Sequence, residues 1–225
     1  MRENMKEFFT KYKHGWILLY LLIYIPWFAY LEKTVTRRFN VIHMAIDDYI
    51  PFIEYFIIPY MLWFIYVAIA VVYMFFTNVS DYYKLCLFLF SGMTVFLIVS
   101  TVYPNGHTLR PLVYENDNIF VTMVQYLHKM DTPTNLFPSI HVYNSIGVHI
   151  AVSHNEKLKS NKWLQIGSFI LMVSIILSTV FLKQHSVFDV ITGILMAALI
   201  YSLVYGIDWQ KGRRKAYDEQ ISSNF

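Results

Sequence analysis

Two residues near the carboxyl end of the chain carry the strongest chemical signal in the sequence. His185 and Asp189 are four residues apart, so on a helix both side chains lie on one face. The carboxylate can then hold one nitrogen of the imidazole ring. An interfacial histidine beside a capping aspartate is the alternative interpretation. Lys183 is either a cation of the same site or a lysine whose ammonium reaches the membrane boundary.

A second group of polar residues opens an apolar run. Pro138-Ser139-Ile140-His141 is typical of a helix start, where the free N–H groups of the first turn bind anions. His141, Ser145 and His149 then recur every four residues, which predicts a polar stripe facing the interior of a helical bundle. For His149, a hydrogen-bonded packing role explains the pattern at least as well as catalysis does.

Together these residues suit chemistry on a phosphoryl group. One histidine attacks phosphorus and the other protonates the departing oxygen, while Arg110, Lys183 and helix N–H groups neutralise the remaining phosphoryl oxygens. No spacing of cysteines, histidines or carboxylates is typical of a metal cage, and Asp47-Asp48 is interpreted as a solvated loop. We therefore expect neither a metal nor another cofactor.

The composition indicates which elements position these residues. Of the 225 residues, 56% are hydrophobic and only 15% are charged, against roughly 25% charged in a soluble domain. This balance excludes a disordered chain, a coiled coil and a nucleic-acid binder built on a basic surface. The single cysteine, Cys86, excludes a disulfide framework. We expect one membrane-embedded domain over residues 1–225.

Six apolar runs are interpreted as membrane-spanning helices, because about 20 residues cross a bilayer as a helix. The fold class is therefore an all-α membrane bundle. The runs cover residues 15–31, 52–76, 85–103, 138–153, 163–182 and 186–207. The longest polar stretch, 104–137, is expected to contain a short amphipathic helix at about 118–130.

Six spans place both termini on one side of the membrane. Of the 18 lysines and arginines, twelve fall on that side and six on the other, which predicts cytoplasmic termini and a cytoplasmic tail at 208–225. The third span then ends, and the fourth and sixth begin, on the extracytoplasmic face. We expect the candidate residues to converge there, in a multi-pass protein of the cell membrane.

Three motifs occur in order over residues 103–193. They are Arg110-Pro111, Pro138-Ser139-Ile140-His141, and Ser178-Thr179-x5-His185-x3-Asp189. These resemble the motifs K-x6-R-P, P-S-G-H and S-R-x5-H-x3-D of the type 2 phosphatidic acid phosphatase superfamily, whose fold is shared with the vanadium haloperoxidases. The resemblance implies a six-helix membrane phosphatase.

The resemblance also implies a role for each matching residue. His185 is the nucleophile that forms a phosphohistidine, Asp189 orients it, and His141 is the general acid. Arg110 and Ser139 are phosphate ligands by the same resemblance.

Two family cations are missing from these motifs. Tyr103 stands at the position of the first-motif lysine, and Thr179 stands at that of the third-motif arginine. Lys183 is the expected replacement for one cation, and Lys129 or His107 for the other. These departures resemble the branch that includes inositol phosphorylceramide synthase and sphingomyelin synthase.

The leading hypothesis is a lipid phosphatase acting on a substrate such as phosphatidic acid, phosphatidylglycerophosphate or a polyprenyl diphosphate. Its expected partners are this lipid and the bilayer, and no nucleic acid. Transfer of a phospholipid headgroup to a hydroxyl acceptor is the alternative within enzymes. A membrane scaffold or transporter is the alternative outside them, although the sequence has no internal repeat and no matched pair of broken spans. The sequence leaves the lipid and the oligomeric state open.

Overall fold

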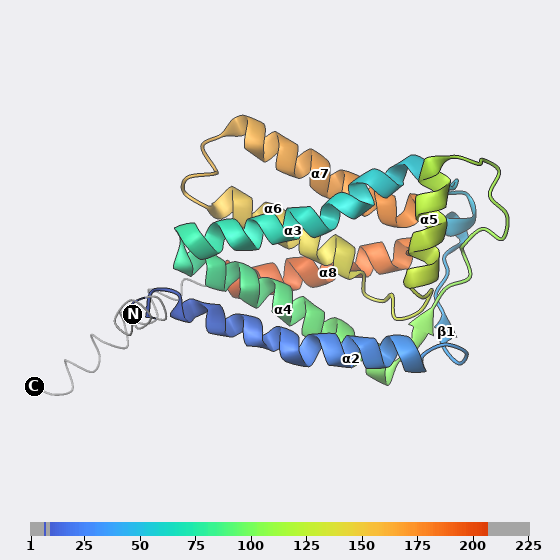
Figure 1. The fold of residues 1–225 in the computed structure, drawn as a ribbon, viewed down its shortest axis with the longest axis horizontal. Coiled ribbons are helices and arrows are strands. Elements are labelled where there is room, and N and C mark those ends of the chain that lie inside the picture. Colours follow the sequence, from blue (N-terminus) through green and yellow to red (C-terminus); the bar gives the residue numbers. More distant parts are fainter. Residues whose placement is uncertain (1–6, 8–9, 207–225) are drawn as a thin grey trace, which may run out of the picture.

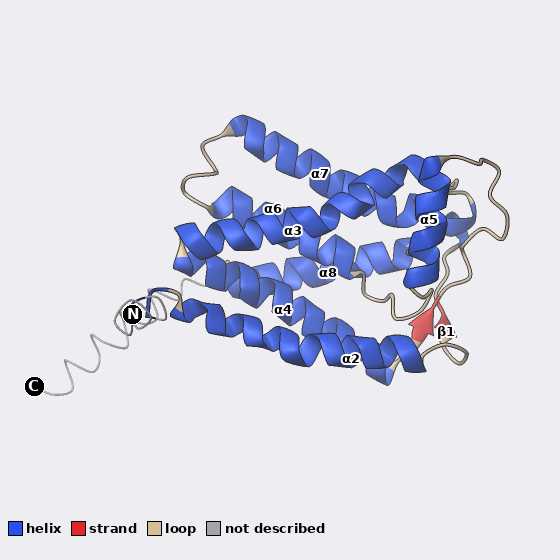
Figure 2. Ribbon diagram, viewed as in Figure 1, coloured by secondary structure: helices blue, strands red, loops and turns tan. Residues whose placement is uncertain are grey.

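The computed structural model describes residue 7 and residues 10–206 of the chain. Within them, helices run side by side in a bundle, and one short helix lies across one end (Figures 1 and 2). The tail expected at 208–225 lies outside the described residues, as does the end of the last expected span. The same holds for six of the cations counted for the topology, which are Arg2, Lys6, Lys211, Arg213, Arg214 and Lys215.

The helices of the bundle follow the apolar runs of the sequence. They are η1 (Lys13–Tyr20) continuing into α2 (Leu21–Thr34), α3 (Ile57–Thr77), α4 (Val79–Val102), α6 (Ile140–His154), α7 (Lys162–Phe181) and α8 (Val187–Val204). The short helix across the end is α5 (Ile119–Met130), close to its expected position. Two 3-10 turns, η2 (Ala45–Asp48) and η3 (Glu54–Phe56), lie in the connection between α2 and α3.

Five segments are long and apolar enough to cross a membrane, which indicates a multi-pass membrane protein. They are Lys13–Thr34, Glu54–Thr77, Val79–Val102, Lys162–Phe181 and Val187–Val204. Their outward faces carry large apolar side chains such as Leu22, Ile69 and Leu199, each at least 63% exposed. α6 has only 15 residues, so a sixth span stays a prediction.

The third span begins earlier than the sequence predicts. Residues 79–84 are the start of α4 and not a polar connection, because the side chain of the N-cap Asn78 accepts hydrogen bonds from the N–H groups of Ser80 and Asp81. Asp81 in turn accepts a hydrogen bond of 2.7 Å from the side chain of Asn155. Local capping and one contact to the end of α6 therefore keep this polar stretch in the helix.

Three loops and α5 close the end of the bundle at which α6 and α8 begin (Figure 1). We call this end, formed by residues 35–56, 103–139 and 182–189, the capped end. Two short strands, β1 (Asn40–Val41) and β2 (Asn105–Gly106), pair in parallel there, and a bridge joins Gly106 to Thr134. The fold is therefore mostly helical and not strictly all-α, because backbone pairing ties together the loops that carry the motifs.

α6 and α8 approach each other closely at the capped end. A Cβ atom at Gly193 of α8 would lie 3.0 Å from the carbonyl oxygen of Ser139. The N–H of Ser139 also donates to the carbonyl of Asp189. A glycine at this position thus lets the starts of the two motif helices pack side by side.

Candidate active site

Three predicted residues form a chain of contacts at the capped end. Nδ1 of His185 lies 3.4 Å from Oδ2 of Asp189, and Nε2 of His185 lies 3.4 Å from Nδ1 of His141. The side chain of His185 is 5% exposed and that of Asp189 is fully buried. The structure therefore brings together residues that are 44 positions apart in the sequence.

The carboxylate sets the tautomer of His185. An ionised carboxylate only accepts hydrogen bonds, so Nδ1 carries the hydrogen and Nε2 presents its lone pair. That lone pair faces Nδ1 of His141, which can then donate. Both distances are longer than a typical hydrogen bond, as is common in catalytic sites without substrate. The relay provides a nucleophilic nitrogen beside a proton donor.

The turn that carries His185 is fixed by the main chain of Thr179. The N–H groups of Gln184 and His185 both donate to the carbonyl of Thr179 at 2.9 Å. Lys183, at φ 55°, adopts the left-handed conformation that lets the chain reverse between α7 and α8. The residue that replaces the family arginine is itself buried, and its hydroxyl donates to Ile176.

The N-terminus of α8 is occupied by protein groups, which corrects the expectation that it binds an anion. Oδ1 of Asp47 accepts from the N–H of Val187 at 2.8 Å, and Oδ2 accepts from the hydroxyl of Ser186 at 2.6 Å. The N–H of Ser186 donates to Asp189, and the N–H of Phe188 donates to Ser186. A buried carboxylate therefore takes the place that a phosphate would fill.

Asp47 also corrects the interpretation of Asp47-Asp48 as a solvated loop. Asp47 is only 2% exposed, whereas the side chain of Asp48 is 64% exposed. The difference arises because η2 turns Asp47 toward α8, where the carboxylate meets three donors.

The start of α6 keeps donors that a phosphate can use. The hydroxyl oxygen of Ser139 caps the helix by accepting from the N–H of Val142 at 3.4 Å, so its own hydrogen is free to bind another oxygen. The ring of Trp63 lies 4.4 Å from that of His141, and that of Tyr60 lies 4.7 Å from it. Nε1 of Trp63 is buried and has no acceptor among the described residues, which leaves a donor beside His141.

Arg110 reaches this site through Gln184. Its guanidinium donates to the backbone carbonyls of His128, Asp131 and Thr132 and to the side chain of Gln184, the residue before His185. Burial lowers the pKa of Arg110 from its usual value, and the nearby Asp131 opposes that shift. Arg110 therefore ties its own loop to the turn that carries His185.

Lys183 points toward the loop that contains Asp47. Its ammonium group donates to the carbonyls of Asp47 and Ile50, so two of its three donors are used by the backbone. Burial lowers its pKa. The structure thus joins Lys183 to the loop that contains Asp47. The role of Lys183 as a phosphate ligand stays a prediction.

His107 does not replace a missing cation, contrary to the expectation. Its Nδ1 accepts from the N–H of Leu109, and its Nε2 donates to the carbonyl of Gln184. Burial is the main cause that lowers the pKa of His107 to about 3, so the ring is neutral at neutral pH. The other candidate, Lys129, lies exposed at the end of α5, and Tyr103 is 46% exposed.

The matching family model covers the segment that builds this site. A model described as the PAP2 superfamily matches residues 109–213. Over this segment the chain is similar to the PAP2 superfamily. The finding confirms the resemblance to the type 2 phosphatidic acid phosphatases, whose members are phosphoric-ester hydrolases or related transferases. Comparisons with the curated proteins and with the solved structures find no match.

Sequence reasoning missed several residues of this candidate site. Gln184, Asp47 and Trp63 contact the three motif segments, yet none is a residue that a motif specifies, since Gln184 occupies a variable position of the third motif. Gln184 had a weak signal, because it directly precedes His185. Asp47 had none, because its partner Ser186 lies 139 residues further along the chain.

Proposed function

We propose that the protein is an integral-membrane phosphatase that hydrolyses a lipid phosphate or lipid diphosphate through a phosphohistidine at His185. The observation that carries this proposal is the relay from Asp189 through His185 to His141 at the capped end. Such a relay supplies a nucleophile, its orienting carboxylate and a proton donor.

The first step forms a bond between Nε2 of His185 and phosphorus, and breaks the bond between phosphorus and the lipid oxygen. His141 begins this step protonated on both ring nitrogens, gives its Nδ1 proton to that oxygen and becomes neutral, and the lipid alcohol or lipid monophosphate leaves. Asp189 holds the Nδ1 hydrogen and stabilises the positive charge on the ring. Since the two imidazole nitrogens lie 3.4 Å apart, the phosphoryl group must separate the rings when it binds.

The second step returns the enzyme to its starting state. His141 takes a proton from water, the water oxygen attacks phosphorus, and the bond to Nε2 of His185 breaks to release inorganic phosphate. The hydroxyl of Ser139, two residues before His141, and the N–H of Trp63, whose ring packs against His141, are donors that can neutralise phosphoryl oxygens.

The test is phosphate release by purified protein in detergent, with EDTA, from a panel of lipid phosphates and diphosphates. Wild type should release phosphate, and His185→Ala should lose at least about 10²-fold in rate. His154→Ala is the matched control, because His154 is an exposed histidine at the far end of α6. Equal activity of His185→Ala and wild type would contradict the proposal. If the lipid substrate is consumed only when a hydroxyl acceptor is added, and no inorganic phosphate is released, the result would indicate headgroup transfer.

We also propose that the capped end faces the outside of the cell membrane. A membrane-impermeant thiol reagent applied to intact cells should label a cysteine at Glu115 and not one at Ser160. Both positions are exposed, in connections at opposite ends of the bundle, and the native Cys86 is buried. The reverse labelling would contradict this orientation.

A further inference from the structure

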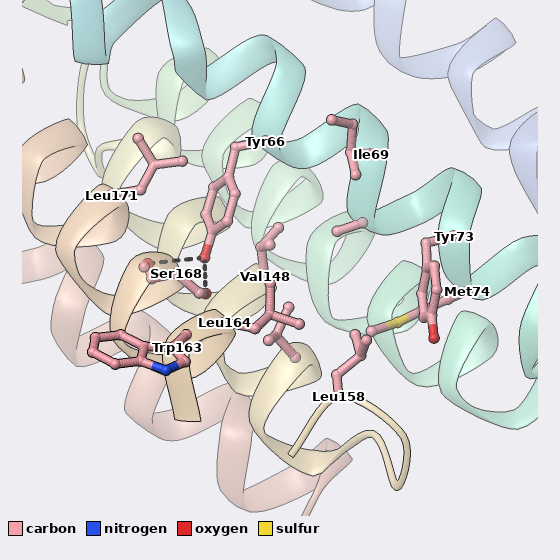
Figure 3. Close-up of a pocket in the computed structure, with 13 residues that line it drawn as sticks. Tyr66, Ile69, Tyr73, Met74, Val148, Leu158, Trp163, Leu164, Ser168 and Leu171 are labelled. Atoms are coloured by element: carbon pink, nitrogen blue, oxygen red, sulfur yellow. Dashed lines mark hydrogen bonds between the residues drawn. The ribbon is translucent and has the colours of Figure 1, made fainter. Parts of the chain in front are cut away.

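A groove of about 360 Å³ lies between α3, α6 and α7 (Figure 3). It is in the half of the bundle that is farther from the capped end. Its lining is almost entirely apolar and includes Ala70, Met74, Val148 and Leu164. Its volume falls in the range of ligand pockets. Ile69 at its rim is 63% exposed, so the groove opens sideways toward the surroundings of the bundle.

The groove continues the helix faces that meet the general acid. On α6, Val148 and Val152 stand seven and eleven residues after His141, which places all three on one face. At 1.5 Å per residue, these valines lie about 10 and 16 Å along the helix from His141. On α3, Tyr66 lies three residues after Trp63, which packs against the same histidine.

A small polar cluster holds the groove walls together. The hydroxyl of Tyr66 on α3 lies 2.6 Å from the hydroxyl of Ser168 on α7 (Figure 3). Nδ1 of His149 on α6 lies 3.0 Å from the same Ser168 oxygen. These bonds join the three helices, so the groove is formed before any ligand enters. They also give His149 the packing role that was the alternative to catalysis.

We propose that this groove holds one hydrocarbon chain of the lipid substrate while its phosphate lies between His141 and His185. The inference rests on the proposed function and deepens it, because it makes the substrate a phosphate ester of a long-chain lipid. A chain that starts at the site must extend beyond about 16 Å to fill the groove as far as Val152.

The gain from filling the groove is orientation and not transfer from water. Bilayer chains are as apolar as the groove, so moving a chain between them changes little free energy. An ordered chain instead fixes the position of the attached phosphate relative to His185. A substitution whose side chain fills the groove is therefore the most direct way to test whether the groove orients the lipid.

Gly167 offers such a perturbation. It lines the groove, and a Cβ atom built on it meets no other atom within 4 Å. Gly167→Phe should therefore occupy the groove without disturbing the helices, and glycine replacement also favours a helix. Ile170→Phe is the control, because Ile170 lies on the same helix, is 58% exposed and does not line the groove.

The experiment uses a photoreactive lipid phosphate with a diazirine near the middle of its chain, and a phosphatidylcholine with the same chain. The His185→Ala protein in vesicles prevents turnover of the probe. The phosphate probe should label residues 164–171 of α7 or 66–74 of α3 several-fold more than the choline probe does. Adding Gly167→Phe should remove this preference, and adding Ile170→Phe should keep it.

Equal labelling by the two probes would overturn the inference, because it would show that bulk lipid fills the groove. Phosphate release by the protein with His185 intact tests the proposed function separately. Release together with equal labelling would contradict the groove alone. Preferential labelling without phosphate release would contradict the phosphatase function and support the groove.

Discussion

The capped end and the groove differ in the interactions that stabilise their buried side chains. At the capped end, buried polar side chains such as Asp47, His107 and Gln184 bond to segments 74 or more residues away in the chain. Around the groove, the lining is mostly apolar, and the polar contacts between its helices come from the cluster centred on Ser168 and from Gln165, which bonds to α6.

This difference matches two tasks. A phosphoryl group is small and charged, so it needs donors and a nucleophile fixed in direction. A hydrocarbon chain makes no directional contacts, so it needs only a cavity of matching shape. The comparison implies that substitutions at the capped end impair turnover, whereas substitutions in the groove change which lipids are preferred.

The largest effect on kcat is expected when substitutions at the two ends of α6 are compared. His141→Gln should lower kcat by about 10²- to 10⁴-fold, because the proton donor to the leaving oxygen is lost. His154→Gln, at the opposite end of the same helix, should leave kcat unchanged. Steady-state phosphate release measures both variants. A similar kcat for the two variants would break the comparison.

The next effect is on stability in acid, and it should arise at the capped end. The pKa of His107 is lowered to about 3 in the folded protein, below its unfolded value near 6.5. The unfolded chain therefore binds the proton first, and stability is lost as the pH falls below about 6.5. Between pH 7 and pH 5 this loss amounts to roughly 2 kcal/mol.

Unfolding in detergent at pH 7 and pH 5 measures this loss. His107→Gln keeps one donor and one acceptor, so the variant should lose roughly 2 kcal/mol less than wild type does over this range. The comparison between the two proteins is needed because burial raises the pKa of Asp131 to about 6, which acts in the opposite direction. An identical pH dependence for both proteins would show that His107 is not held neutral.

The smallest expected effect is a difference in kcat between substitutions of two neighbouring carboxylates. Asp47→Asn should lower kcat about tenfold with little change in KM, because an amide cannot accept both hydrogen bonds that Ser186 and Val187, in the turn after His185, donate to the two carboxylate oxygens. Asp48→Asn should have no effect, since Asp48 bonds only to His43 at the surface. Equal kcat values for the two variants would show that capping of α8 does not position the nucleophile.

The sequence predicts the parts of the molecule that depend on local spacing. Apolar runs place the long helices, and the interval between His185 and Asp189 places both on one helix face. The start of α6 at Ile140 follows from the proline and serine before it.

Features that depend on distant contacts are not predictable in this way. Asp47 and Asp48 have the same side chain, and only the fold buries one of them. The neutral state of His107 likewise depends on burial, which the fold brings about by packing the ring against a segment 77 residues away. The groove requires three helices whose residues carry no motif, so its position becomes visible only when the helices are packed.

The most direct test of the central claim is to identify the covalent intermediate. The protein is mixed with a lipid phosphate labelled on phosphorus, quenched in alkali within one turnover, digested and mapped. We expect an acid-labile, alkali-stable label on the peptide that contains His185, and no such label in the His185→Ala protein. Phosphate release without any labelled histidine, or a label on another residue, would contradict the account.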